Sequence, residues 1–111
     1  MSLFKVLDAS EAKLASLGNG AMLGDIDCSK DKKLTGGFYE QSHSEEPLNY
    51  TYTYDELKIV LEGELQIKNT ATGEEFTAKA GQVLNISDGA ALQFNSPTKA
   101  RIFYVAKRAP L

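Results

Sequence analysis

Hydrophobic and polar residues alternate in short runs along most of the chain, with turn-forming residues between the runs. Alternation places successive side chains on opposite faces of a β-strand, and the runs are rich in residues that favour strands. Strands are predicted at Met22–Cys28, Leu34–Gln41, Leu48–Tyr54, Glu56–Leu61, Leu65–Asn69, Glu74–Ala78, Val83–Ile86, Ala91–Asn95 and Arg101–Lys107. Many short strands separated by turn residues predict an all-β sandwich or barrel.

Two places in this pattern need a separate interpretation. Near the N-terminus, Asp8 and Glu11 have the spacing of a capping box, and leucines follow at helical spacing, so a short helix is predicted over roughly residues Ala9–Leu17. Between two of the predicted strands, Glu62-Gly63-Glu64 indicates either a tight turn or a glycine kink.

Composition and charge narrow the class of protein and its partners. The 111 residues suit one domain, and their composition, 42% hydrophobic and 24% charged, is that of a globular protein. The net charge is −3, and the densest basic cluster, Lys30–Lys33, contains an aspartate, so no nucleic-acid partner is expected. No apolar run approaches the roughly 20 residues of a membrane span and no signal peptide is recognised, so no membrane partner is expected. A single cysteine favours a reducing compartment, and the predicted location is the cytoplasm.

The chain contains few residues of the kind that bind metals. One histidine and one cysteine exclude a Cys₄ or Cys₂His₂ zinc site and an internal disulfide within one chain. The single histidine, His43, lies in a polar segment. We interpret it as a solvated loop residue, with a role as ligand or general base as the alternative.

Two glycine-marked segments carry a family resemblance. The first is Tyr50-Thr-Tyr52-Thr-Tyr-Asp-Glu56 followed by Leu-Lys-Ile-Val-Leu-Glu-Gly63, and the second is Gly81-Gln-Val-Leu-Asn-Ile-Ser87-Asp-Gly89-Ala-Ala-Leu92. They resemble the two motifs of the cupin family, which forms a small double-stranded β-helix or jelly-roll barrel. The resemblance implies a single cupin domain over residues 1–111, with the barrel core at about residues 38–110.

The same motifs depart from the family where cupins bind metal. Glu56 matches the acidic position of the first motif, but the histidine positions fall on Tyr50, Tyr52 and Leu92. Three of the four expected ligands are therefore absent, and one carboxylate alone holds a metal ion only weakly. We therefore predict that the protein uses no metal and no other cofactor.

Within the cupins, the chain is most similar to the ethanolamine-utilisation protein Q group. The similarity lies in Tyr54-Asp-Glu-Leu-Lys-Ile-Val-Leu-Glu-Gly63 and in the final strand Phe103-Tyr-Val105, although the group commonly has an acidic residue where this chain has Lys58. The resemblance implies a homodimeric barrel associated with amine or aldehyde metabolism. We expect Met22–Cys28 or the first residues at the dimer interface, because open sheet edges need to be covered.

Residue parity places the charged residues of the first motif together. Glu56 and Lys58 are two positions apart on a strand and therefore share a face. We hypothesise that the Lys58 ammonium stands where a metal would supply positive charge, paired with Glu56, in a pocket for a small polar metabolite. The other pocket candidates are Tyr39, Tyr50, Tyr52, Leu92, Phe94 and Tyr104. Alternatively, Lys58 reaches the barrel rim or a bulge reverses the parity, the tyrosines are ordinary sheet residues, and Glu56 makes a structural pair.

These residues leave three functions open. The first is a binding, accessory or sensor protein that holds a small polar metabolite in a metal-free barrel. The second is a metal-independent or degenerate-site enzyme, an isomerase, lyase or hydrolase, with Glu56, Lys58 and the pocket tyrosines as acid–base groups. The third is a structural protein whose barrel is filled by its own side chains.

Overall fold

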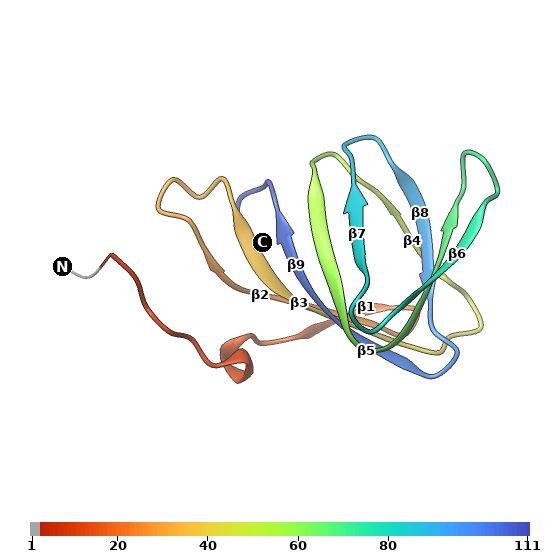
Figure 1. Cartoon of the computed structure of the whole chain (residues 1–111), viewed down its shortest axis with the longest axis horizontal. Coiled ribbons are helices and arrows are strands. Elements are labelled where there is room, and N and C mark those ends of the chain that lie inside the picture. Colours follow the sequence, from red (N-terminus) through yellow and green to blue (C-terminus); the bar gives the residue numbers. More distant parts are fainter. Residues whose placement is uncertain (1–2) are drawn as a thin grey trace.

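Residues 3–111 are described by a computed structural model, in which nine strands wind into a nearly closed barrel (Figure 1). The strands are β1 (Ala15–Gly18), β2 (Ala21–Cys28), β3 (Thr35–Ser42), β4 (Leu48–Thr51), β5 (Glu56–Asn69), β6 (Glu75–Lys79), β7 (Val83–Ile86), β8 (Ala91–Asn95) and β9 (Lys99–Ala106). The all-β fold predicted from the alternation is confirmed. No helix in this part of the chain is long and apolar enough to cross a membrane.

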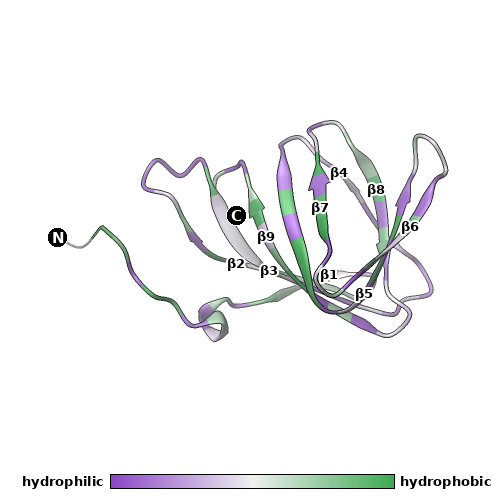
Figure 2. Ribbon diagram, in the orientation of Figure 1, coloured by the Kyte–Doolittle hydropathy of each residue, from purple (hydrophilic) through white to green (hydrophobic). Residues whose placement is uncertain are grey.

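All strand pairs are antiparallel and form two sheets that share β5. The first sheet has the order β1-β2-β3-β9-β5-β7 and contains the first part of β5. The second sheet has the order β4-β8-β5-β6 and contains the last part of β5. Figure 2 shows hydrophobic and hydrophilic residues alternating along β5. In the first half of the strand the usual order is reversed, because Glu56 and Lys58 are buried whereas Leu57 is 52% exposed.

A kink in β5 allows one strand to belong to both sheets. The register against β9 shifts between Val60 and Glu62, and Gly63 has a φ of 74°. A Cβ atom at Gly63 would lie 1.9 Å from the carbonyl oxygen of Lys99, so the close approach of the two strands requires glycine. Of the two interpretations of Glu62-Gly63-Glu64, the glycine kink is confirmed and the tight turn is wrong.

The interior between the sheets is filled by the inward-facing side chains of the alternating strands. On β9, Ala100, Ile102 and Tyr104 are buried while their neighbours are more exposed. On β5, Val60 and Leu65 are completely buried on opposite sides of the kink. Burial of this apolar surface supplies most of the favourable free energy of folding.

The predicted helix at Ala9–Leu17 is wrong. The capping box itself is present, with the backbone amide of Asp8 donating to the Glu11 carboxylate at 2.7 Å, but it closes only a 3₁₀ turn at Ala9–Glu11. The chain then extends, and Ala15–Gly18 pairs with β2 as an edge strand. A helix this short gains little by itself, whereas pairing with β2 satisfies backbone groups along the sheet edge.

Candidate functional site

The first half of β5 carries a buried ion pair on its inward face. Glu56 and Lys58 are two residues apart, and their side chains are 6% and 4% exposed. Lys58 Nζ lies 3.0 Å from Glu56 Oε2 and donates a hydrogen bond of 3.1 Å to the hydroxyl of Tyr52. The strand bulge follows Val60 and therefore leaves the parity of Glu56 and Lys58 intact.

Aromatic rings from three other parts of the chain surround the Lys58 ammonium. Its Nζ is 4.6 Å from the ring centre of Phe94 on β8, 4.9 Å from Tyr39 on β3 and 5.7 Å from Tyr52 just after β4. The electron-rich ring faces attract a cation, most strongly when it is shielded from water. The Glu56 carboxylate and these rings together compensate for the loss of hydration at Lys58.

Burial changes the acid–base behaviour of this group of residues. It lowers the pKa of Lys58, and the neighbouring Glu56 charge opposes that change only in part. It also raises the pKa of Tyr39 and of Tyr52, and the charge of Glu56 adds to both effects. Both phenols therefore stay protonated at neutral pH and act as hydrogen-bonding groups.

A cavity of about 180 Å³ lies against this ion pair. Its lining is mostly apolar and aromatic apart from a few charged groups, and consists of Leu17, Leu23, Tyr39, Leu48, Tyr50, Tyr52, Tyr54, Glu56, Lys58, Phe94, Arg108 and Leu111. Among these, Leu17, Tyr50 and Leu111 are 50%, 40% and 85% exposed, which marks the side on which the cavity meets solvent. A small compartment with apolar walls and a few polar groups is typical of a ligand site.

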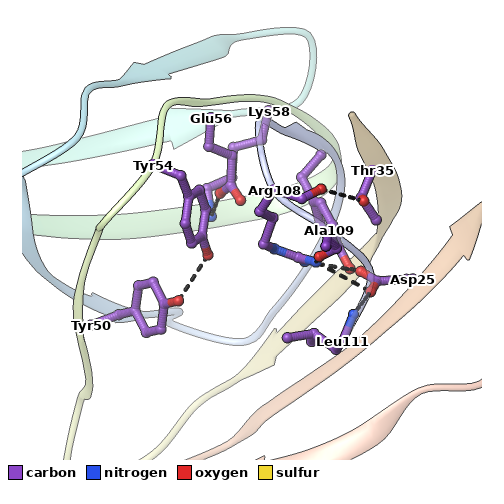
Figure 3. A network of polar contacts seen from close by, with 10 residues as sticks. Asp25, Thr35, Tyr50, Tyr54, Glu56, Lys58, Arg108, Ala109 and Leu111 are labelled. Carbon is purple, nitrogen blue, oxygen red and sulfur yellow. Dashed lines mark hydrogen bonds and ion pairs between the residues drawn. The ribbon is translucent and has the colours of Figure 1, made fainter. Parts of the chain in front are cut away.

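Tyrosines form one side of the cavity. The hydroxyls of Tyr50 and Tyr54 are 2.8 Å apart and hydrogen-bonded (Figure 3). The ring of Tyr52 packs edge-on against both of the others, with ring centres 4.7 Å and 5.6 Å apart. The alternating sequence from Tyr50 to Tyr54 thus supplies three rings that hold one another in place.

A second ion pair holds the C-terminal residues beside the cavity. Arg108 Nη2 lies 2.9 Å from Asp25 Oδ1, and the Asp25 carboxylate also accepts hydrogen bonds from the Tyr104 hydroxyl and the Leu111 amide (Figure 3). The Arg108 guanidinium lies over the rings of Tyr54 and Tyr104, each 5.6 Å away. Asp25 on β2 therefore positions Arg108 and Leu111 at the cavity.

Most, but not all, of the residues singled out from the sequence meet in this cavity. Those that line it are Glu56, Lys58, Tyr39, Tyr50, Tyr52 and Phe94. Leu92 packs against the core and borders a separate groove with Ile67 and Ile86. Tyr104 turns to Asp25 instead. His43 is exposed on its loop, with Nδ1 3.1 Å from the Ser96 carbonyl oxygen.

Several lining residues are not among those predicted from the sequence. Leu48 could have been found, because it shares the parity of Tyr50 and Tyr52 on a predicted strand. Arg108 and Leu111 follow the last strand, where no periodicity indicates direction, so no sequence signal places them at the cavity.

The usual cupin metal ligands are replaced by groups that do not fit a metal ion. Tyr52 interacts with Lys58, Leu92 lies outside the cavity, and the Glu56 carboxylate is already paired with the Lys58 ammonium. Within residues 3–111, no three histidine, cysteine, aspartate or glutamate side chains come together as a metal site would require. A metal at this position would have to displace an ammonium that makes a close ion pair.

The topology and this site define a cupin barrel with a buried lysine at its centre. An RmlC-like cupin from Shewanella frigidimarina, 14% identical, has the same fold, with a TM-score of 0.75 over 98% of this chain and 93% of that one. The sequence profile of the family described as ethanolamine utilisation protein EutQ matches residues 4–110. The chain belongs to this EutQ family.

Relatives of known name agree with the family match. The protein named acetate kinase EutQ from Salmonella typhimurium is 35% identical over 107 residues, which are 92% of this chain and 45% of that protein. The Escherichia coli protein of the same name is 31% identical over 92% of this chain and 44% of its own length. The chain thus spans less than half the length of these curated relatives. A crystal structure of an ethanolamine utilization protein Q from Salmonella typhimurium LT2 is 33% identical and has a TM-score of 0.81, over 96% of this chain and 87% of that chain.

Proposed function

We propose that the barrel binds a small polar metabolite and that the protein serves as an accessory or sensor protein in ethanolamine utilisation. The observation that carries the proposal is the cavity of about 180 Å³ that contains the Glu56–Lys58 pair. The third function considered from the sequence, a barrel filled entirely by its own side chains, is less compatible with this open volume. Family membership supports the metabolic setting.

The lining favours a ligand with two different ends. Leu17, Leu23 and Leu48 offer apolar surface for a short hydrocarbon part. Lys58 and Arg108 offer positive charge for an oxygen acceptor. Among the described residues, Arg108 Nε is the buried side-chain polar atom that has no hydrogen-bond partner. Because buried donors are normally hydrogen-bonded, this N–H is available to an oxygen atom of the ligand.

A thermal-shift screen tests binding. A ligand that binds only the folded protein raises its melting temperature, by mass action. The screen uses small amines, aldehydes, alcohols and carboxylates, with acetate included because of the names of the relatives. We expect at least one compound to stabilise the wild type and Lys68→Met, but not Lys58→Met. Lys68 is the matched control because it lies on the same strand with its side chain exposed. Equal shifts in all three proteins, or none, would contradict binding at this cavity.

An enzymatic role is the second candidate, because two titratable groups meet in the cavity. Glu56 and Lys58 at 3.0 Å could exchange a proton with a bound substrate, with the tyrosines as further hydrogen-bonding groups. The names of the relatives make phosphoryl transfer between ATP and acetate the first reaction to assay. Turnover that is lost in Glu56→Gln and kept in Lys68→Met would favour the enzyme over the accessory protein.

We also propose that two copies of the chain form a homodimer in the cytoplasm. The chain before the 3₁₀ turn, residues 3–8, is called the N-terminal arm. Its exposed apolar side chains support the dimer, since Leu3, Phe4 and Val6 are 82%, 80% and 88% exposed. The single free cysteine supports a reducing compartment.

A further inference from the structure

Lys58 brings a primary amine to the wall of a cavity, a position that binding alone does not require. The other lining residues could hold a ligand through hydrogen bonds and apolar contact, whereas an amine can also form a covalent bond with a carbonyl carbon. In Figure 3, Lys58 and Glu56 lie next to one another beside Tyr54. All three residues line the cavity.

We propose that Lys58 captures small aldehydes reversibly, as an iminium adduct inside the barrel. This inference rests on the proposed function, because the aldehyde has to enter the same cavity. The apolar lining from Leu17, Leu23 and Leu48 suits the short hydrocarbon part of such a molecule, and Lys58 belongs to the same lining.

The chemistry can be completed by the two residues of the ion pair. Glu56 Oε2, 3.0 Å away, takes a proton from the ammonium, and the freed lone pair on Nζ attacks the carbonyl carbon. The C–N bond forms, the π electrons of the carbonyl move to its oxygen, and a proton shifts from nitrogen to that oxygen to give a carbinolamine. Glu56 then returns its proton to the hydroxyl, which leaves as water while the nitrogen lone pair forms the C=N bond. One aldehyde is consumed and one water is released.

The surroundings of Lys58 suit both the amine and the adduct. Burial favours the uncharged amine, which is the reactive form. The iminium carries the same single positive charge as the ammonium that it replaces, so it retains the attraction of Glu56 and of the rings of Phe94 and Tyr39. The Tyr39 and Tyr52 hydroxyls stay neutral and do not add a competing charge.

Reductive trapping tests this step directly. The folded wild-type protein is incubated at neutral pH with acetaldehyde and sodium cyanoborohydride, which reduces an iminium to a stable ethylamine. Peptide mapping by mass spectrometry then gives the rate of ethylation at each lysine. We expect Lys58 to be ethylated at least about tenfold faster than Lys68, which is exposed on the same strand and reports the reactivity of an ordinary lysine.

Two further measurements separate this inference from simple reactivity and from the proposed function. In Glu56→Gln, ethylation of Lys58 should slow by at least about tenfold while that of Lys68 is unchanged, since the proton carrier is lost. In urea, where the cavity is absent, the two lysines of the wild type should react equally. Ethylation of Lys58 no faster than Lys68 in the folded wild type overturns the inference. The proposed function still stands in that case if a non-carbonyl compound such as an alcohol or a carboxylate gives the Lys58-dependent thermal shift.

Discussion

At the residue scale, Lys58 and Glu56 are each tolerated in the interior because of the other. Removing one member of a buried ion pair leaves an uncompensated charge, whereas replacing both removes the desolvation cost as well. We expect Lys58→Met to lower the free energy of unfolding by about 3 kcal/mol. The free energy of unfolding of the double variant Glu56→Gln/Lys58→Met should be closer to that of the wild type than the value for Lys58→Met is. Urea denaturation of Lys58→Met, Glu56→Gln and the double variant measures the coupling energy between the two residues. Additive effects of the two single substitutions would contradict this mutual dependence.

Asp25 makes stability depend on pH in the acid range. Burial tends to raise its pKa, but hydrogen bonds from Arg108, the Leu111 amide and Tyr104 outweigh burial and lower the pKa below the ordinary 3.8. A carboxyl with a lowered folded-state pKa stabilises the fold above the unfolded value, and this contribution is lost as the pH falls through the folded value. Asp25→Asn should therefore lower the free energy of unfolding by about 2 kcal/mol at neutral pH.

The role of Asp25 is tested by the difference in the free energy of unfolding between wild type and Asp25→Asn, measured across pH. Urea denaturation from neutral pH down to acid should show the gap between wild type and Asp25→Asn narrowing below about pH 4, as the wild-type carboxyl takes up its proton. A gap that stays constant with pH would show that Asp25 acts only through its shape and neutral hydrogen bonds.

The two ion pairs differ in how far the sequence could predict them. Glu56 and Lys58 are neighbours on one strand, so their shared face follows from the two-residue period of a strand. Asp25 and Arg108 are 83 residues apart, and only the pairing of β2, β3 and β9 brings them together. Contacts of that kind depend on topology, which no local pattern contains.

At the scale of elements, the kink of β5 depends on a glycine without a side chain. Gly63→Ala meets both an unfavourable positive φ and a clash with the Lys99 carbonyl. We expect a loss of roughly 2 kcal/mol or more in the free energy of unfolding. The matched control is Gly73→Ala, because Gly73 has a similar φ of 79° but open space around its Cβ position. Chemical denaturation should show the smaller loss for Gly73→Ala, and equal losses would mean that the clash is relieved by a small backbone movement.

Most of the strands were predictable from the sequence, whereas several of their ends and the first strand, β1, were not. Alternation and turn residues locate β7 and β8 to the residue, because both signals are local. The capping box at Asp8 is also a true local signal, but it cannot show that the next residues pair with β2 instead of continuing as a helix. That choice is made by the free edge of the sheet, a property of the assembled barrel.

At the scale of the whole molecule, the N-terminal arm is mostly exposed, although its Lys5 Nζ lies 3.1 Å from Asp27 Oδ2 on β2. Figure 1 shows residues from 3 onward running away from the barrel before the 3₁₀ turn. We expect the wild type to be a dimer by light scattering, with the arm of one copy covering apolar surface of the other. Phe4→Ser combined with Val6→Ser should shift it to the monomer at micromolar concentration. Lys13→Ser, an exposed change that lies beyond the 3₁₀ turn and outside the arm, should leave the dimer intact. A monomeric wild type would contradict the arm's role.

The shared strand β5 determines how the protein opens to solvent. Because this one segment pairs with β6, β7, β8 and β9, the two sheets cannot separate or unfold one at a time without breaking hydrogen bonds along it. The amides of Val60 and Leu65, on the two sides of the kink, should then exchange with deuterium at the same slow rate, through global unfolding alone. Glu56 and Lys58 lie on this strand, so the centre of the cavity persists as long as the fold does. Any opening that admits a ligand has to come from the edge strand β1, which carries Leu17, and from the C-terminal residues around Leu111, where the cavity meets solvent.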